Sequence, residues 1–263
     1  MPTYYHGKGS RVLLSTVDAS SSLTSITVTH NIDAPETTCF TDDARTYLAG
    51  NREATMSLEG LFDGSTAFTT ESFAPVRSAL GSTAPVLITV IPGGPGGSTV
   101  TPGSNARIAA TRLTNFDITS PAMNVVNVKV GAQVDGTLGY GRTLYGPGAA
   151  KTATFTGTSV DSGFVSGTTG GGIAQFHITN SSGSVSALTI KVQHSPDNAS
   201  WSDLVSSTAT GIGSIGAGSS PAAKQVSVTG TVYRYTRVNV TTFTGGASKS
   251  IRLVASFARG TKN

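Results

Sequence analysis

Apolar and polar residues alternate with a period of two along much of the chain, and this constrains the fold more than any other feature. A strand places successive side chains on opposite faces of its sheet, so the pattern predicts strands with one buried face. The clearest examples lie at 26–32, 54–62, 126–135 and 188–194. Shorter strands are expected at 11–16, 86–91, 107–118, 174–179, 225–229, 232–240 and 251–257. The chain is therefore expected to be mainly β and antiparallel.

Two segments depart from this alternation. Phe73, Val76 and Leu80 have helical spacing, Thr70 precedes them as a capping residue, and Gly81 follows as a stop. This pattern predicts one helix among the strands. The segment 42–50 also ends at a glycine and is expected to form a further short turn of helix.

Composition excludes several classes of protein. Only 12% of the residues are charged and 32 of 263 are glycine, which argues against long charged helices. No run approaches the roughly 20 apolar residues that a membrane-spanning helix needs. Residues 1–6 lack the apolar core of a signal peptide. We therefore expect neither a membrane association nor export.

The residues that usually carry catalysis or bind metals are sparse. Cys39 is the single cysteine, so it has no partner for an internal disulfide, and the four histidines show no metal-ligand spacing. The nucleophile, zinc-protease and paired-carboxylate motifs of enzymes are absent. The glycine pattern at 211–216 lacks the strand and helix of a dinucleotide site and indicates a loop. We expect no enzyme activity, no cofactor and no metal.

Charge divides the chain into two parts. Residues 1–150 hold 9 Lys and Arg against 11 Asp and Glu, a balance of −2, whereas 151–263 hold 9 against 3, a balance of +6. The shift coincides with the Gly- and Pro-rich run 146–151. This pattern predicts a first domain at 1–146, a linker at 147–151 and a second domain, a small immunoglobulin-like β-sandwich, at 152–263.

The second domain contains aromatic and cationic residues that are suited to surface binding. They are Trp201, Tyr233, Arg234, Tyr235 and Arg237. Aromatic rings stack on sugars and arginines attract anions, so the group could form a binding platform. The single Trp of a small sandwich is more often the buried anchor of its core, and this is the other role open to Trp201.

The run from Thr41 to Gly64 resembles the tail tube (major tail) proteins of long-tailed bacteriophages. The segments 194–201 and 233–237 look like the β-sandwich that is often appended to such proteins. The resemblance implies a first domain of tail-tube type, an antiparallel β-sandwich or barrel with one helix.

The resemblance also implies an assembly. Copies of the chain, six in the usual family member, would join their first-domain sheets edge to edge into rings that stack into a tube, through which DNA passes without specific binding. The protein would then belong to the virion tail, together with other tail proteins, after assembly in the bacterial host cytoplasm. Lumen carboxylates would repel DNA, and the candidates are Glu53, Glu59, Asp63, Asp117 and Asp135.

Two loops are the expected contacts between subunits or rings. One is the loop 41–50, with Asp42, Asp43, Arg45 and Tyr47. The other is the glycine-rich loop 92–97, with Pro92, Gly93 and Pro95.

Two alternatives to a tube subunit remain open. In the first, the chain is a virion surface or decoration protein whose second domain binds host-surface glycans or anionic polymers. In the second, it is a β protein associated with the phage head. Whether the purified protein forms tubes or sits on shells distinguishes these functions.

Overall fold

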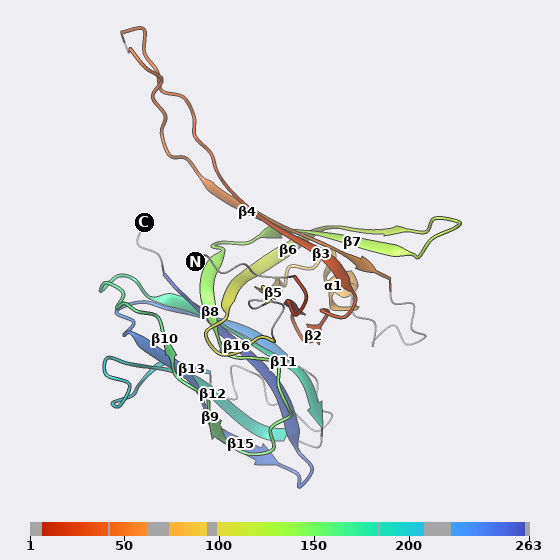
Figure 1. The fold of residues 1–263 in the computed structure, drawn as a ribbon, viewed down its shortest axis with the longest axis vertical. Helices are drawn as coiled ribbons and strands as arrows, with labels where there is room; N and C mark the ends of the chain where they lie inside the picture. Colours follow the sequence, from red (N-terminus) through yellow and green to blue (C-terminus); the bar gives the residue numbers. More distant parts are fainter. Residues whose placement is uncertain are drawn as a thin grey trace.

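The computed structural model describes residues 7–41, 43–62, 74–93, 99–182, 185–207 and 222–260 (Figure 1). These residues form sixteen strands and one short helix, which confirms the expected mainly antiparallel β fold. The elements are β1 (Arg11–Leu14), β2 (Val17–Asp18), β3 (Leu23–Ile32), β4 (Arg52–Leu61), α1 (Ala74–Ala79), β5 (Val86–Ile91), β6 (Asn105–Thr119), β7 (Asn127–Val134), β8 (Gly139–Tyr145), β9 (Phe155–Thr156), β10 (Val160–Asp161), β11 (Gly172–Ser182), β12 (Val185–Ser195), β13 (Ser202–Ser207), β14 (Ala222–Val228), β15 (Tyr235–Gly245) and β16 (Ser250–Arg259).

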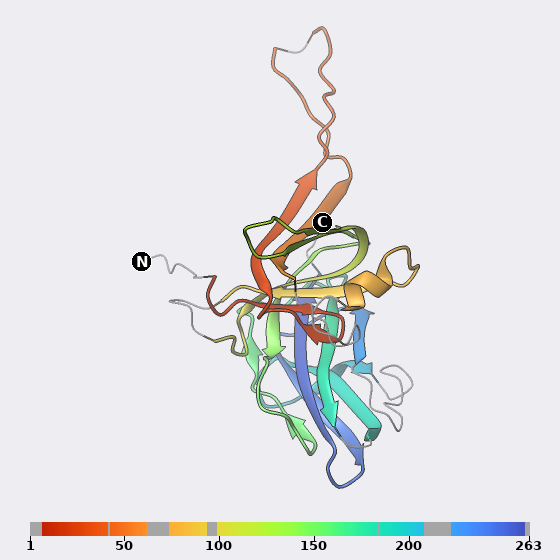
Figure 2. The ribbon, with the colours of Figure 1, turned by 90° about the vertical axis from the view of Figure 1, so that its right-hand side faces the viewer.

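An eleven-stranded sheet runs through both halves of the chain. Its main path is β14-β11-β16-β8-β6-β5-β1-β2. A branch leaves this path at β6, where β7, β4 and β3 follow in order. We call this branch, made of β3, β4, β7 and residues 112–119 of β6, the wing. It extends away from the body beneath a long loop (Figures 1 and 2).

A second sheet of five strands covers the C-terminal part of the first. Its order is β10-β15-β12-β13, with β9 also paired to β15. Alternate residues of β12 and β15 point inward, including Ile190, Val192, Val238 and Val240. They pack against Phe176 and its neighbours on β11 and β16, so a continuous apolar core separates the two sheets.

Strands β11 and β16 are buried on both faces, unlike the half-buried strands that simple alternation predicts. One face carries the sandwich core, and the other packs against the N-terminal half. A separate apolar cluster joins Leu13, Ile91 and Ile108 to Val254 and Ala258. The two halves are therefore packed against each other through a buried interface.

A polar cluster is buried in this interface. Thr89 Oγ1 on β5 lies 2.5 Å from Gln175 Oε1 and 2.8 Å from His177 Nε2, both on β11. His177 Nδ1 lies 2.6 Å from the carbonyl oxygen of Ser15. Burial lowers the pKa of His177 to about 4, although the contact with Ser15 opposes this effect. His177 is therefore neutral at physiological pH and donates from Nδ1 to Ser15.

The segment expected to be a linker lies beside the main sheet. Strand β8, which precedes it, pairs with β16, and Lys151 forms an isolated bridge with Ile251. A Cβ at Gly141 would lie 2.3 Å from the carbonyl oxygen of Phe257, so glycine permits the close approach of β8 and β16. The sheet is thus continuous across 147–151, and the division into 1–146 and 152–263 stays a prediction.

The expected helices have different outcomes. Helix α1 contains Val76, which is fully buried. Gly81, with φ +75°, lies just beyond the end of the helix. Thr70 and Phe73 lie outside the described residues. The turn of helix expected at 42–50 is wrong for the described residues 43–50. Tyr47 is bridged to Glu36 across a hairpin, which a helix would not allow. No described helix is long and apolar enough to span a membrane.

Candidate assembly surfaces

The wing has two edges that no described strand covers. Among the described strands, β3 pairs with β4, and residues 112–119 of β6 pair with β7. Strand β5 covers the other side of β6 only as far as Thr111. Backbone groups at such edges are a template for pairing with another chain.

The free edge of β3 lacks the usual protection against such pairing. Its ten residues include no Pro, Lys, Arg, Asp or Glu, and a bulge occurs only at its start. The Asp33 N–H donates to the carbonyl of Asn51 beside β4. Because hydrogen-bonding groups alternate in direction along a strand, the backbone groups of Ile26, Val28 and His30 point to the free edge.

The two faces of the wing differ in chemistry. One face carries Met56, Leu58, Val128 and Val130, which are buried in the N-terminal core together with Val76. The opposite face is polar. Its acidic residues include Glu53, Glu59 and Asp117, and its basic residues are Arg112 and Lys129. Lys129 Nζ forms an ion pair with Glu59 Oε1 at 2.9 Å. Arg112 Nε forms a second ion pair, with Asp135 Oδ2, at 2.9 Å. Of the five lumen candidates, only Asp63 lies outside the described residues.

Residues 33–51 connect β3 to β4 and form a long projection, which we call the arm (Figure 1). Phe40, Tyr47 and Leu48 are exposed on it, as are Asp43 and Arg45. Arg45 lies 3.9 Å from Glu36, an exposed and therefore weak pair. The arm projects three of the predicted contact residues into solvent; the fourth, Asp42, lies outside the described residues.

The glycine-rich loop at 92–97 is described only at its start. Gly93 is buried, and its N–H donates to Ser10 Oγ at 2.9 Å. Pro92 is half-buried, and Pro95 lies outside the described residues. Pro92 and Gly93 therefore anchor the loop to the N-terminal segment.

The C-terminal aromatic and cationic residues are divided between two places. Tyr235 and Arg237 lie on the outer face of the five-stranded sheet, because Thr236 and Val238 between and beside them are buried. The Arg237 guanidinium stacks 3.9 Å from the centre of the Trp201 ring and donates to Gln193 Oε1. Trp201 is half-buried on the surface, so its alternative role as a core anchor is wrong.

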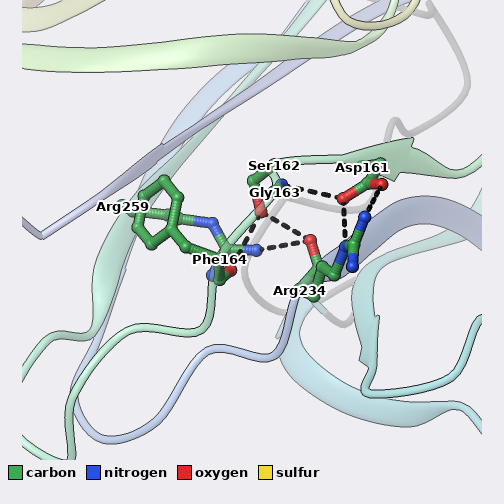
Figure 3. Close-up of polar contacts among 6 residues, drawn as sticks. All are labelled: Asp161, Ser162, Gly163, Phe164, Arg234 and Arg259. Atoms are coloured by element: carbon green, nitrogen blue, oxygen red, sulfur yellow. Dashed lines mark hydrogen bonds and ion pairs between the residues drawn. The ribbon is translucent and has the colours of Figure 1, made fainter.

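Arg234 also belongs to a polar cluster, shown in Figure 3. Its Nε and Nη2 each donate to the Asp161 carboxylate at 2.7 Å. These bonds, with the Gly163 N–H, lower the pKa of Asp161 to about 2. Arg259 in the same cluster donates to the carbonyls of Val232, Tyr233 and Arg234.

Tyr233 lies near this cluster without joining the Trp201 pair. Its ring lies 4.6 Å from that of His194, and its N–H donates to His194 Nδ1 at 3.2 Å. Burial, and then the charge of Arg259, lower the pKa of His194. Arg234 lies 5.3 Å from the centre of the Tyr235 ring and so is connected to the outer face of the sheet, whereas Tyr233 packs on His194.

The sequence patterns missed a hollow of about 720 Å³ where the two halves meet. Arg107, Arg142 and Arg259 line it together with Tyr140, Phe164 and Val165, and we call it the arginine groove. These residues come from β6, β8, β16 and the segment after β10. No local motif links them, and only an excess of arginine over acidic residues in these segments could have indicated the groove.

No metal site is formed in the part of the chain that the structure describes: no three His, Cys, Asp or Glu side chains there are grouped to hold an ion.

No family model and no curated protein matches the sequence. Among solved structures, the virion of a native gene transfer agent particle is similar at 14% identity, covering 52% of this chain and 98% of that chain, with a TM-score of 0.40. The SPP1 tail tube is similar at 10% identity over 51% and 78% of the two chains, with a TM-score of 0.39. The SPP1 Dit protein, described as a hub adsorption apparatus in phages infecting Gram-positive bacteria, is similar at 9% identity over 96% and 99%, with a TM-score of 0.36.

Proposed function

We propose that the chain is a structural subunit of a phage tail tube. Copies join through their wings into closed rings, which stack into a conduit for DNA. The observation that carries the proposal is that no described strand pairs with the outer edge of β3, which is ten residues long and carries no charged residue or proline; residues 112–119 of β6 lie at the opposite end of the wing.

The strand directions in the wing suit closure into a ring. Each of its three internal pairings is antiparallel, so β3 and β6 run in opposite directions. When β3 of one copy lies beside residues 112–119 of the next, the new pairing is also antiparallel. Repetition of this head-to-tail contact gives a closed barrel without edges. The resemblance of residues 41–64 to tail tube proteins favours six copies.

The polar face of the wing is suited to a lumen. In such a barrel the apolar face stays against the N-terminal core, so the polar face lines the inside. With Asp135 included, four carboxylates there face two cations, Arg112 and Lys129. A lumen with net negative charge repels phosphate and lets DNA slide without the grip that exposed Lys or Arg would exert.

The arm and the 92–97 loop supply further contacts between subunits or rings. The arm is the stronger candidate because it carries exposed Phe40, Tyr47 and Leu48 far from the body. Isolated exposed apolar side chains are ordinary, but three on one narrow projection are typical of a contact surface. The tube belongs to the virion tail and assembles in the host cytoplasm.

The alternative, a surface protein that binds glycans or anionic polymers through its second half, has weaker support. The guanidinium of Arg234 is engaged by Asp161, and that of Arg237 by Gln193 and the ring of Trp201. A ligand would have to displace these contacts.

Electron microscopy of the purified protein tests the proposal. Wild type should form rings or tubes, and Val28→Pro should remain folded but form none, because proline removes a donor at the free edge of β3. Val28→Thr is the matched control, since it keeps both the N–H and the side-chain shape. Ile26→Pro tests the same edge if Val28→Pro folds poorly. A wild-type protein that stays monomeric at high concentration, or edge variants that polymerise normally, would contradict the proposal.

A further inference from the structure

The arginine groove is a concentrated positive surface without acidic residues of its own. None of its lining residues is Asp or Glu. Among the described residues, no ion pair involves Arg107, Arg142 or Arg259. Their contacts are with carbonyl oxygens or rings: Arg107 with Ala106 and Tyr140, Arg142 with Gly103, and Arg259 with three carbonyls and the Phe164 ring.

Arg259 makes the groove attractive to an anion. Its guanidinium is largely buried, and this burial lowers its pKa to about 10. The Asp161 carboxylate raises that pKa again but is itself held by Arg234 (Figure 3). Neutral carbonyls only partly replace the water that a buried cation loses, so a carboxylate entering the groove would stabilise it.

The groove also exposes apolar surface beside its charges. Tyr140, Phe164 and Val165 are among the exposed large hydrophobic residues of the protein. A ligand that matches the groove must therefore combine carboxylates with apolar side chains. A small inorganic anion would satisfy the charge and leave the apolar surface uncovered.

The arm has this combination. Residues 33–51 contain Asp33, Glu36, Asp42 and Asp43 against Arg45 alone, a net charge of −3, which equals in size the +3 of the groove arginines. The same segment exposes Phe40, Tyr47 and Leu48. The arm projects away from the body of its own chain (Figure 2), and Phe40, Leu48 and Asp43 on it are exposed.

We propose that the arm of one copy docks into the arginine groove of a second copy of this chain. The inference rests on the proposed self-assembly and names the surface that receives the arm. Carboxylates of the arm lie against the groove arginines, and the arm's apolar side chains cover Tyr140, Phe164 and Val165.

A charge-swap series tests the electrostatic part. Arg107→Glu with Arg142→Glu reverses the groove, and Glu36→Lys with Asp43→Lys reverses the arm. Each pair alone should lower the sedimentable polymer at least about tenfold, since like charges brought together oppose docking. All four changes combined should restore most of it. Lys249→Glu, at the far tip of the sandwich, is the control and should polymerise normally.

A cross-link tests the geometry independently of charge. Cys39 is exposed on the arm and is the chain's single cysteine. In the Val165→Cys variant, mild oxidation should form a disulfide between Cys39 of one copy and the introduced cysteine of another, identified by mass spectrometry of the linked peptides. Ala247→Cys, exposed at a distant turn, should not cross-link to Cys39 above background. Adding Cys39→Ser to Val165→Cys should abolish the product.

The outcomes separate this inference from the proposed function. Normal tubes from the groove reversal, or tubes without the Val165→Cys cross-link, overturn docking and leave the tube subunit intact. A wild-type protein that never forms tubes, together with a specific cross-link in Val165→Cys, overturns the tube and supports docking. Loss of polymer in both reversals without rescue by the four-residue swap also counts against docking, provided that circular dichroism shows each variant folded.

Discussion

The sheet edges of the C-terminal sandwich are protected against pairing with another chain, whereas the β3 edge of the wing is not. Strand β13 ends the five-stranded sheet with only six residues, and its Asp203 is held by Lys191 and Gln193. Strand β14 ends the large sheet and carries Lys224 near its middle. Short edges and edge charges prevent association with other chains. Strand β3 has ten residues and neither protection.

Burial shows the same contrast. Strands β11 and β16 are covered on both faces, by the sandwich core on one and by the N-terminal half on the other. The wing has one buried face, one polar face and two edges that no described strand covers. From this difference we expect the sandwich to be stable within one chain, and the proposed assembly would cover the edges of the wing.

Removal of the arm should have the largest effect on tube formation. The Asp33 N–H donates to the Asn51 carbonyl at 2.9 Å, so the hairpin can be closed by replacing residues 34–49 with Asn-Gly. We expect a folded monomer that forms no tubes, with the free energy of unfolding changed by less than about 1 kcal/mol because the segment is exposed. Electron microscopy and urea unfolding measure the two effects. Normal tubes from the shortened chain would show that the arm is dispensable for assembly and would overturn its docking into the arginine groove.

Truncation of a side chain in the sandwich core should have the opposite effect: it should lower the free energy of unfolding and leave tube formation intact. Phe176 is almost fully buried in the core between the two sheets. Phe176→Ala should lower the free energy of unfolding by about 3–5 kcal/mol. Any protein that remains folded should still form tubes. Phe164→Ala, at an exposed aromatic residue, is the control and should cost far less in urea unfolding.

Acid should weaken the interface between the halves through His177. Its pKa is about 4 in the folded protein and near the ordinary value of 6.5 when unfolded, so folding favours the neutral form. The stabilisation is complete above pH 6.5 and is lost as pH falls towards 4, by up to about 3 kcal/mol. Urea unfolding at pH 7, 5.5 and 4.5 measures this loss. His177→Gln should remove this part of the loss and leave the part that comes from the lowered pKa of His194.

The smallest expected effect concerns the outer face of the sandwich. Trp201→Ala removes the stacking with Arg237 and should lower the free energy of unfolding by about 0.5–1 kcal/mol, with tubes unaffected. Glycan arrays with wild type and variant sharpen the comparison. Glycan binding that disappears in Trp201→Ala would favour a surface-binding role for this half.

Local sequence patterns predicted many of the strands and the helix, but they did not predict which segments pair with one another or which faces are buried. Alternation placed strands close to β3, β4, β7 and β12, and helical spacing with Gly81 placed α1. The helix expected at 42–50 was wrong because Gly50 looked like a helix stop. Its N–H instead donates to Asp33 across a hairpin, a pairing that the local sequence does not reveal.

The candidate site was predicted in part. The arm and its exposed residues 43, 45 and 47 follow from the resemblance of 41–64. In the platform expected from Trp201 to Arg237, the Arg234 guanidinium is held by Asp161 on the neighbouring β10, and Tyr233 packs on His194. The arginine groove was missed, since Arg107, Arg142 and Arg259 are brought together only by the pairing of β6, β8 and β16.

By itself the sequence determined that the chain is mainly β, because side-chain alternation is a property of neighbouring residues. It also determined that β3 carries no protecting charge. Only the tertiary structure decided which edge stays uncovered, how the halves pack across 147–151, and where three arginines converge. These are relations between segments far apart in the chain, and they are set by strand pairing and shared burial.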